Sequence, residues 1–280
     1  ENVKTFYNHS YSDLTLSSAM SYLRAVAARS YNDFDSYRKY SAEVPTIREW
    51  QFCGVFENMN SSGLDVVYDP ESHPKNDIPF EANSNGKVQW YKQVKSDPNE
   101  AYTFFEGHNE YGSGVHYAQT FINNPTAKKV VLRLGSSDRI KAWVNDVLVV
   151  ENAKGANSDF DAYMVEIDLP KGTSRLLVKV SGESANNLFS ARFTDGKGAV
   201  VNDLKYSSDY SDYVKSSLEE LNPVIVKSKF EEFFEQKIKS DPNNFLYHYC
   251  LARTFLRNEK HQEAKAVIQP LYEANPKSSI

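Results

Sequence analysis

The sequence predicts an antiparallel β-sandwich of the jelly-roll type, flanked by helical hairpins. The main evidence is the segment 130–180, where apolar and polar residues alternate and Gly, Pro, Asn and Asp gather at the breaks. This pattern is typical of half-buried antiparallel strands. Towards both ends, apolar residues recur instead at three and four positions, which is typical of amphipathic helices. We therefore expect a helical hairpin over 1–46, the sandwich over 47–198 and helices over 199–280.

The first part is predicted to be a hairpin of two helices. Ser12 or Asp13 can cap the first helix, and Pro45 ends the second because the residue before proline is disfavoured in the α region. Phe34 and Tyr37 of the second helix have the right spacing to pack on the first. The apolar stripe of the first helix consists of Leu16, Ala19, Met20, Leu23, Val26 and Ala27.

Short strands are expected from Trp50 onward, where aromatic and β-branched residues alternate with turn formers. The candidate segments are WQFCGVFEN, VVYDPE, KVQWYKQ, AYTFFEG and VHYAQTFI. A long loop between Asp69 and Gly86 follows the second of them. Loops of such length in a compact domain are usually functional or mobile, so this loop is one place to look for a site.

The later strands allow each side chain to be assigned to a face, because neighbouring side chains of a strand point in opposite directions. The predicted core face contains Leu132, Leu134, Ile140, Ala142, Val144, Val165, Ile167, Leu169, Leu176, Val178, Val180, Phe189, Ala191 and Phe193. The opposite face, predicted to be mixed charged and apolar, carries Val131, Arg133, Lys141, Trp143, Met164, Glu166, Asp168, Arg175, Leu177, Lys179 and Arg192. Asn145-Asp146 and Pro170-Lys171-Gly172 are predicted turns.

The C-terminal segment places small and apolar residues at the offsets of a helix-turn-helix unit of about 34 residues. They are His248, Leu251, Ala252, Phe255, Ala264, Ile268, Leu271 and Pro276. This arrangement resembles a tetratricopeptide repeat, with His248 where Trp is usual. Pro242 indicates a preceding unit over about 211–244. Such units cannot bury their faces alone, so the sandwich or a continuation of the chain is expected to cover them.

The composition argues against several classes of function. The formal net charge is −5 and Lys and Arg are not clustered, whereas nucleic acids and anionic membranes require a concentrated positive surface. No apolar stretch approaches the roughly 20 residues of a spanning helix, so no membrane insertion is expected. Cys53 and Cys250 are expected to be free thiols. The chain begins without Met and stops after a predicted helix, so we expect it to belong to a longer polypeptide.

A series of motifs in the middle third resembles the galactose-binding-type β-sandwich of large secreted or periplasmic multidomain proteins. They are WQFCGVF, YDPE, VQW, LGSSDRIKAWVNDVLV, KGTSRLLVKV and FSARFTD, which together span about 48–197. The resemblance implies an accessory, noncatalytic module outside the cytoplasm. Family members commonly lie between helical repeats and a transglutaminase-like or other hydrolase domain further along the chain.

The chain departs from this family at the hairpin tip. The usual Asp-Asp pair is Ser137-Asp138, and the following Gly is Arg139. In related protective-antigen-type sandwiches an acidic pair there holds Ca²⁺ and sugar, so no metal is expected at this tip. Acids of the long loop match no defined calcium loop and are expected to be solvated; they are Asp65, Asp69, Glu71 and Asp77. No cofactor is expected, although structural calcium stays open.

Trp143 is the leading candidate for ligand contact. It lies on the predicted outer face beside Lys141, and an aromatic ring flanked by hydrogen-bonding groups is suited to the apolar face of a sugar. With Arg133 and Asp138 these residues form the predicted ligand-binding set. The alternative is that another strand, the N-terminal helices or the long loop covers Trp143.

No catalytic motif is present in the sequence. GxSxG, HExxH, CxxC, a Walker loop and GxGxxG are all absent, and the six histidines lack metal-ligand spacing. Cys53 falls within a strand rather than at an electropositive helix terminus, so it is not expected to be a nucleophile. The glycine-rich segment 107–117, with His108 and Glu110, is interpreted as a turn. We therefore expect no enzyme activity in this chain.

Three hypotheses follow. The favoured one is a noncatalytic extracytoplasmic binding or scaffolding segment with a glycan or a protein as partner. The second is an architectural spacer whose tetratricopeptide-like face docks a peptide, which requires a covered outer face and a buried Trp143. The third is the accessory region of a transglutaminase-like hydrolase whose active site lies beyond Ile280.

Overall fold

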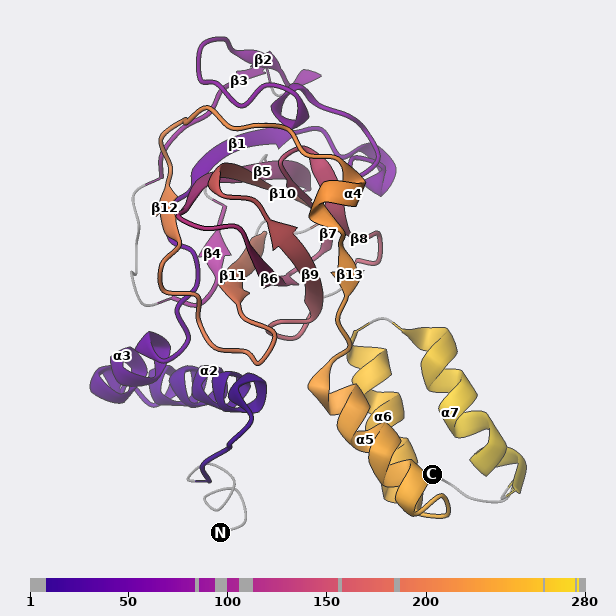
Figure 1. Cartoon of the computed structure of the whole chain (residues 1–280). Helices are drawn as coiled ribbons and strands as arrows, with labels where there is room; N and C mark the ends of the chain where they lie inside the picture. Colours follow the sequence, from indigo (N-terminus) through magenta and orange to yellow (C-terminus); the bar gives the residue numbers. More distant parts are fainter. Residues whose placement is uncertain are drawn as a thin grey trace.

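The computed structural model describes residues 9–83, 86–93, 100–105, 113–155, 158–183, 187–258, 260–274 and 276. In these residues two antiparallel sheets pack face to face, with helices α2 and α3 below them and helices α5 to α7 on another flank (Figure 1). The predicted antiparallel sandwich with helices at both ends is therefore confirmed. No described helix has the length and apolar character that crossing a membrane requires.

The first sheet has the strand order β1-β5-β10-β7-β8, and β12 also pairs with β5. Its strands are β1 (Gln51–Phe56), β5 (Gly114–Asn124), β10 (Gly172–Gly182), β7 (Arg139–Val144), β8 (Val147–Asn152) and β12 (Lys205–Ser207). The second sheet has the order β13-β9-β6-β11-β4. Its strands are β13 (Val224–Ile225), β9 (Tyr163–Leu169), β6 (Lys128–Ser136), β11 (Leu188–Thr194) and β4 (Thr103–Phe104). A separate small hairpin joins β2 (Phe80–Glu81) to β3 (Lys87–Val88).

The core between the sheets follows the predicted alternation. Every residue assigned to the core face between 132 and 193 is buried there. The turns also have the expected backbone, with φ of 49° at Asn145, 67° at Asp146 and 105° at Gly172. Positive φ at both residues of a two-residue turn fits the right-handed twist of the flanking strands, which fixes the register of β7 and β8.

The outer faces differ from the prediction, because the chain covers much of both. Residues 64–83 and 86–90 lie over the first sheet, where Phe80 and Trp90 pack with Leu177 in a second apolar cluster. Arg175 and Lys179, predicted to lie on an accessible face, are each only 1 % exposed. The mixed charged and apolar surface is therefore in large part an interior layer whose charges are paired within the protein.

The N-terminal hairpin forms as predicted, with α2 (Leu14–Ser30) capped by Asp13 and followed by α3 (Phe34–Ala42). Tyr37 packs on α2, but the prediction for Phe34 is wrong because its side chain is 51 % exposed. The predicted apolar stripe is also wrong in part, since Leu23 and Val26 are exposed. The buried positions of α2 are Thr15, Ser21, Ala25 and Ala28. Small and hydroxylated residues occupy them because α2 packs against α3 and against two arginines of the second sheet.

The segment 199–227 is largely non-helical, although helices were predicted there. It adds β12 and β13 to the two sheets, and the connection between them, residues 208–223, is here called the strap. The strap contains one helical turn, α4 (Leu218–Leu221). The expected repeat unit over 211–244 is thus wrong in its first half, where the one helical turn α4 is followed by β13, which pairs with the edge of β9. VVYDPE likewise forms no strand, and 69–71 is a 3₁₀ turn.

Three helices complete the described chain: α5 (Lys229–Ser240), α6 (Phe245–Arg257) and α7 (His261–Ala274). Leu251, Ala252, Phe255 and Ala264 form the buried core between α6 and α7, and Ile268 packs against it. This is the helix-turn-helix that the spacing predicts. Its kinship to tetratricopeptide repeats stays a prediction.

Candidate functional site

The structure does not bring the four predicted ligand-binding residues together. Trp143 and Lys141 lie on β7 in the first sheet, and Asp138 lies in the turn before it. Arg133 belongs to β6 in the second sheet. The Arg133 side chain is buried there, facing α2 on the far side of the sandwich core.

The polar groups of this predicted set are occupied by the protein itself. Lys141 Nζ lies 3.0 Å from Asp65 Oδ1 and 3.0 Å from Glu151 Oε1. Asp138 accepts hydrogen bonds from the backbone N–H groups of Arg139 and Glu183. Trp143 is partly buried against the cluster that covers the first sheet. A ligand role for these residues stays a prediction, and the covered face agrees with the architectural alternative.

The sequence predicted that the acids of the long loop are solvated, and this is wrong for Glu71. Glu71 Oε1 accepts hydrogen bonds from Lys179 Nζ at 3.0 Å and Tyr117 Oη at 2.6 Å. Asp77 pairs with His73 at 3.4 Å. Among the described residues, no group of three or more His, Cys, Asp and Glu side chains is arranged to hold a metal ion. Glu71 is drawn inward because Lys179, buried opposite it, needs a counter-charge.

Cys53 has the environment of an inert thiol. Its side chain is buried in the apolar cluster beneath residues 64–90, and burial raises the pKa of the thiol far above its ordinary value. A thiolate nucleophile requires the opposite shift. His116 is buried and stacks on Phe105 with ring centroids 5.0 Å apart. His108 and Glu110 lie outside the described residues.

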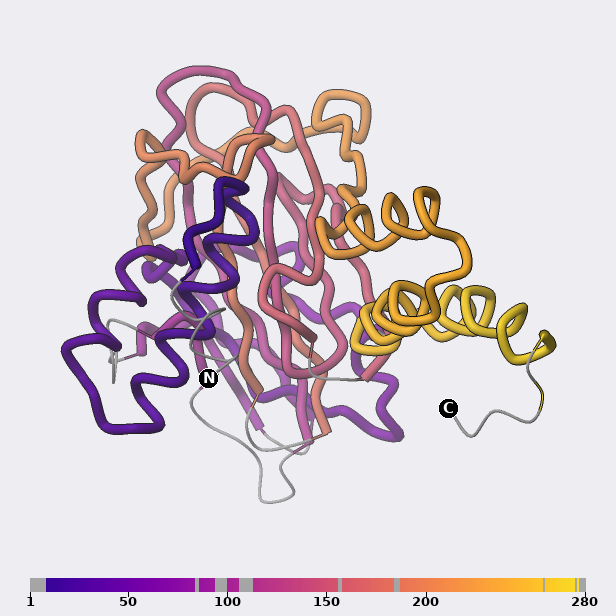
Figure 2. The backbone as a smooth tube through the Cα atoms, turned by 90° about the horizontal axis from the view of Figure 1, so that it is seen from below, coloured from indigo at the N-terminus to yellow at the C-terminus, as the bar shows by residue number. Residues whose placement is uncertain are grey.

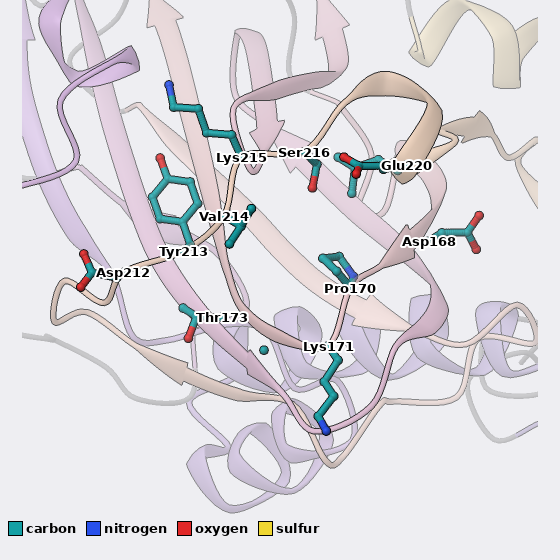
Figure 3. Close-up of a pocket in the computed structure, with 12 residues that line it drawn as sticks. Asp168, Pro170, Lys171, Thr173, Asp212, Tyr213, Val214, Lys215, Ser216 and Glu220 are labelled. Carbon is teal, nitrogen blue, oxygen red and sulfur yellow. The ribbon is translucent and has the colours of Figure 1, made fainter.

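One cleft, of about 420 Å³, lies between the strap and the turn from β9 to β10 (Figure 3). We call it the strap cleft. Its apolar lining comes from Pro170, Val214 and Leu221, and charged side chains surround it. Most of these charges have partners within the chain: Asp168 binds Lys129, Lys215 binds Asp146, and Glu220 accepts from the Ser217 backbone N–H. The strap cleft therefore offers few polar groups to a ligand.

A second cleft, of about 450 Å³, lies where the N-terminal hairpin, the sandwich and the C-terminal helices meet. We call it the junction cleft. It is lined by Ala19, Tyr22, Leu23 and Val26 of α2, by Tyr102, by Ser158, Asp159 and Phe160, and by Phe230, Thr254 and Arg257 of the C-terminal helices. Clefts between separately folded parts of a chain are common ligand sites.

An aromatic stack forms one wall of the junction cleft. The rings of Tyr22 and Phe160 are stacked with centroids 4.8 Å apart and an interplanar angle of 15°. The guanidinium carbon of Arg192 lies 5.3 Å from the centre of the Phe160 ring. Arg192 is buried and donates from Nε to Asp161 Oδ1 at 3.0 Å. The stack is thus anchored by a buried ion pair and is held in place before any ligand arrives.

The rim of the junction cleft carries neutral or neutralised hydrogen-bonding groups. Arg257 Nη2 forms an ion pair with Asp159 Oδ1 across the cleft. Desolvation, followed by the charges of Glu100 and Asp159, raises the pKa of Tyr22 above its ordinary value. The phenol of Tyr22 therefore remains a neutral donor at all physiological pH values. An aromatic wall, a phenol and a compensated ion pair together suit an uncharged ligand with many hydroxyl groups.

Sequence reasoning missed this cleft, since its lining comes from five separate stretches of the chain. The one available signal was the α2 stripe, in which Ala19, Leu23 and Val26 recur at helical spacing. Those residues line the cleft instead of a core. No pattern in the sequence links them to Phe160 or Arg257.

Comparisons with known proteins give only distant similarities. No protein-family model matches the chain, and no curated protein does either. A β-glucosidase from Kluyveromyces marxianus in complex with glucose is 12 % identical over 52 % of this chain and 15 % of its own, with a TM-score of 0.30. The PA14 domain of the antifreeze protein MpAFP is 14 % identical over 36 % of this chain and 56 % of its own, with a TM-score of 0.27.

A family 35 carbohydrate-binding module from an environmental isolate is 18 % identical over 38 % of this chain and 79 % of its own, with a TM-score of 0.27. This chain thus spans only 15 % of the β-glucosidase and 56 % of the PA14 domain. At these TM-scores the similarities carry no conclusion about a ligand.

Proposed function

We propose that this chain is a noncatalytic carbohydrate-binding module and that the junction cleft holds a pyranose ring of a neutral glycan. The Tyr22–Phe160–Arg192 stack is the observation that carries this proposal. One face of a pyranose is lined by C–H groups and packs on an aromatic ring, while its hydroxyls require donors and acceptors at the edge. Tyr22 Oη, Asp159 and Arg257 supply both kinds of group at the rim.

Charge favours a neutral glycan over an acidic one. Asp159 and Arg257 compensate each other, and the carboxylate of Glu100 near Tyr22 is paired with Arg29. Among the described residues that line it, the cleft therefore has no uncompensated cation for a uronate or sulfate group. The protein as a whole carries a net charge of −5, which adds a long-range repulsion against anionic chains.

The arrangement favours binding over hydrolysis. Glycoside hydrolysis requires two carboxyl groups placed on either side of the scissile bond, one of them held protonated. In the junction cleft Asp159 is paired with Arg257, and the neighbouring Asp161 is buried against Arg192. Neither is available as an acid or base. Action outside the cytoplasm belongs to the same proposal and rests on the sequence resemblance alone.

The proposal is tested by a glycan array followed by calorimetric titration of the best neutral oligosaccharide. Tyr22→Ala removes the ring that faces the cleft, so affinity should fall at least tenfold, which corresponds to about 1.4 kcal/mol. Thr254→Val, on the opposite wall, should cost less and leave the fold unchanged. Val214→Ala in the strap cleft is the matched control and should bind as the wild type does.

Two results would contradict this assignment. Absence of binding to any glycan on the array would exclude the carbohydrate function. Loss of binding in Trp143→Ala with retention in Tyr22→Ala would move the site to the first sheet, where the sequence predicted it. Circular dichroism of each variant separates loss of contact from loss of folding.

A second candidate function is docking of a peptide on α6, as the architectural hypothesis requires. An apolar groove of about 540 Å³ is lined by Phe245, Tyr249, Ala252, Arg253, Leu256, Arg257 and Ile268. Phe245 and Tyr249 stack there with centroids 6.0 Å apart. Selection from a displayed peptide library should yield binders that Tyr249→Ala loses. Failure to select any would count against this role. The hypothesis of a following hydrolase domain stays a prediction, which the sequence after Ile280 decides.

A further inference from the structure

The two walls of the junction cleft are attached to the sandwich very differently. The wall formed by α2 is fixed by buried contacts: Arg133 Nη2 donates to Thr15 Oγ1 at 3.1 Å, and Arg192 Nη1 donates to Ser18 Oγ at 3.3 Å. Both arginines come from the central strands of the second sheet. This wall cannot move without uncovering two buried guanidinium groups.

The opposite wall belongs to α5 and α6, which are joined to the sandwich by a short connection. The last backbone hydrogen bond to the second sheet is donated by Val226 N to Met164 O, and Ser228 already caps α5. Lys227 alone separates these two points. In Figure 1 the three C-terminal helices extend away from the sheets below this connection, and Figure 2 shows the same projection from a perpendicular direction.

Among the described residues, one ion pair crosses the cleft from the C-terminal helices to the sandwich. It is the Arg257–Asp159 ion pair, whose side chains are 64 % and 36 % exposed. Exposed ion pairs contribute little to stability and are screened by salt. This ion pair therefore contributes little to holding the C-terminal helices against the sandwich.

The facing surfaces of the cleft are apolar and incompletely buried. Leu23 is 56 % exposed and Val26 is 45 % exposed on α2, and Phe230 is 45 % exposed on α5. Closing the cleft on a ring-shaped ligand would bury these side chains, because the ligand fills the space between them. A ligand that contacts both walls binds the closed arrangement more tightly than the open one and so shifts the population towards it.

We propose that α5 to α7 form a movable jaw of the junction cleft, with Lys227 as its hinge and the Arg257–Asp159 pair as its latch, and that a neutral glycan bound on the Tyr22–Phe160 stack draws the jaw closed. This inference rests on the proposed carbohydrate function and assigns regulation to the same site. Occupancy of the cleft would thereby be converted into a fixed orientation of the C-terminal helices.

The experiment measures distances by pulsed electron spin resonance between spin labels at Asp35→Cys on α3 and Gln236→Cys on α5. Both native residues are exposed, and Cys250→Ser removes the accessible native thiol while Cys53 stays buried. A control pair at Asp35→Cys and Lys205→Cys spans only the fixed part of the molecule. The ligands are cellotetraose, xylotetraose and chitotetraose at millimolar concentration, with binding followed in parallel by calorimetry.

We expect a broad distance distribution for the α3–α5 pair without ligand and a narrow one at shorter distance with the oligosaccharide that binds. Arg257→Gln should broaden the ligand-free distribution further, and the control pair should not change. A narrow ligand-free distribution that a bound oligosaccharide leaves unchanged would overturn the jaw while leaving the carbohydrate site intact. A distribution that stays broad when calorimetry shows the oligosaccharide to be bound would overturn the ligand-driven closure, and the proposed function would stand.

Discussion

Asp161 is the residue on which the covered face of the second sheet depends. It adopts a left-handed backbone with φ of 58°, and its carboxylate binds Arg192 through two nitrogens and Arg133 at 3.4 Å. One carboxylate thus serves two buried guanidinium groups. Desolvation lowers the pKa of Arg133, with Asp161 acting against that change.

Replacing this carboxylate should destabilise the protein strongly. Asp161→Asn keeps the shape but leaves two buried cations without a counter-charge, so the free energy of unfolding should fall by about 3–5 kcal/mol. Urea denaturation followed by tryptophan fluorescence measures it. The control, Asp35→Asn, removes an exposed acid paired with Arg38 and should change stability by less than about 0.5 kcal/mol. Equal effects of the two substitutions would show that the negative charge of Asp161 is not needed to stabilise the two buried arginines.

The sequence could not reveal this cluster. Arg133 and Arg192 alternate with core residues in the way solvated charges do, and their placement on the outer face was predicted correctly. Whether that face meets water depends on α2 and on Asp161, which are remote along the chain. Alternation determines which way a side chain points but not what lies above it.

The segment 64–83 covers the first sheet because two buried cations bind the backbone of its first part. Lys179 Nζ donates to Leu64 O at 2.8 Å and to Val66 O at 2.5 Å, and Arg175 Nη2 donates to Pro70 O at 2.6 Å. A segment with little regular structure is thereby fixed on a sheet. The backbone carbonyl groups that such a segment leaves unpaired accept hydrogen bonds from Lys179 and Arg175 of the sheet.

Removing one of these donors should loosen the segment locally. In Lys179→Met the carbonyls of Leu64 and Val66 lose their donor and the carboxylate of Glu71 keeps only Tyr117, so amide hydrogen exchange in residues 64–71 should accelerate. Exchange in β5 and β10 should stay slow. Lys141→Met, whose partners Asp65 and Glu151 are largely solvated, is the control and should have little effect. Uniform acceleration across the sandwich would contradict a local role.

The strands were more predictable than the connections. Two-residue alternation and turn chemistry identified β6 to β11 because both depend on neighbours in sequence. The strap was mistaken for helix because its apolar spacing is ambiguous. Its two ends are fixed by β12, which pairs with β5, and by β13, which pairs with β9. VVYDPE has the composition of a strand but bends over the sheet, where Lys179 and Arg175 bind its backbone.

The molecule as a whole should lose stability in alkali. Burial raises the pKa of several tyrosines, namely Tyr22, Tyr68, Tyr102, Tyr117, Tyr206 and Tyr213, and raises that of Tyr213 to about 12. A group whose pKa is raised on folding stabilises the native state below its unfolded pKa, which is about 10 for tyrosine. That stabilisation is lost as the pH rises from about 10 towards 12. Burial lowers the pKa of Lys179, so this one residue makes the native state more stable as the pH rises, against the effect of the tyrosines.

The measurement is urea denaturation at a series of pH values from about 8 to 11. We expect a constant free energy of unfolding up to about pH 9.5 and a steady decrease beyond it. Exposed tyrosines such as Tyr31 should ionise first, and the further rise in tyrosinate absorbance from the buried phenols should coincide with unfolding. A free energy that stays constant or increases through pH 11 would contradict the burial of these phenols.

The sandwich with helices at both ends could be predicted from the sequence, but the junction cleft could not. Its walls are distant in the chain, and each of Tyr22, Phe160 and Arg257 is unremarkable in its local sequence. Only the packing of α2 on the second sheet and the return of the strap bring them together. A binding site assembled from several parts of a fold has no local signature.

The strap also determines how this molecule would respond to a pulling force. Tension applied through α7 reaches the sandwich first at β13, whose two residue pairs with β9 can separate one after the other. The strap would then be drawn out at roughly 3.5 Å per residue as far as β12, while the central strands stay paired. The protein would thus lengthen in steps and keep its core intact, so that a force on the C-terminal helices would be taken up by extension of the strap before it reached the central strands.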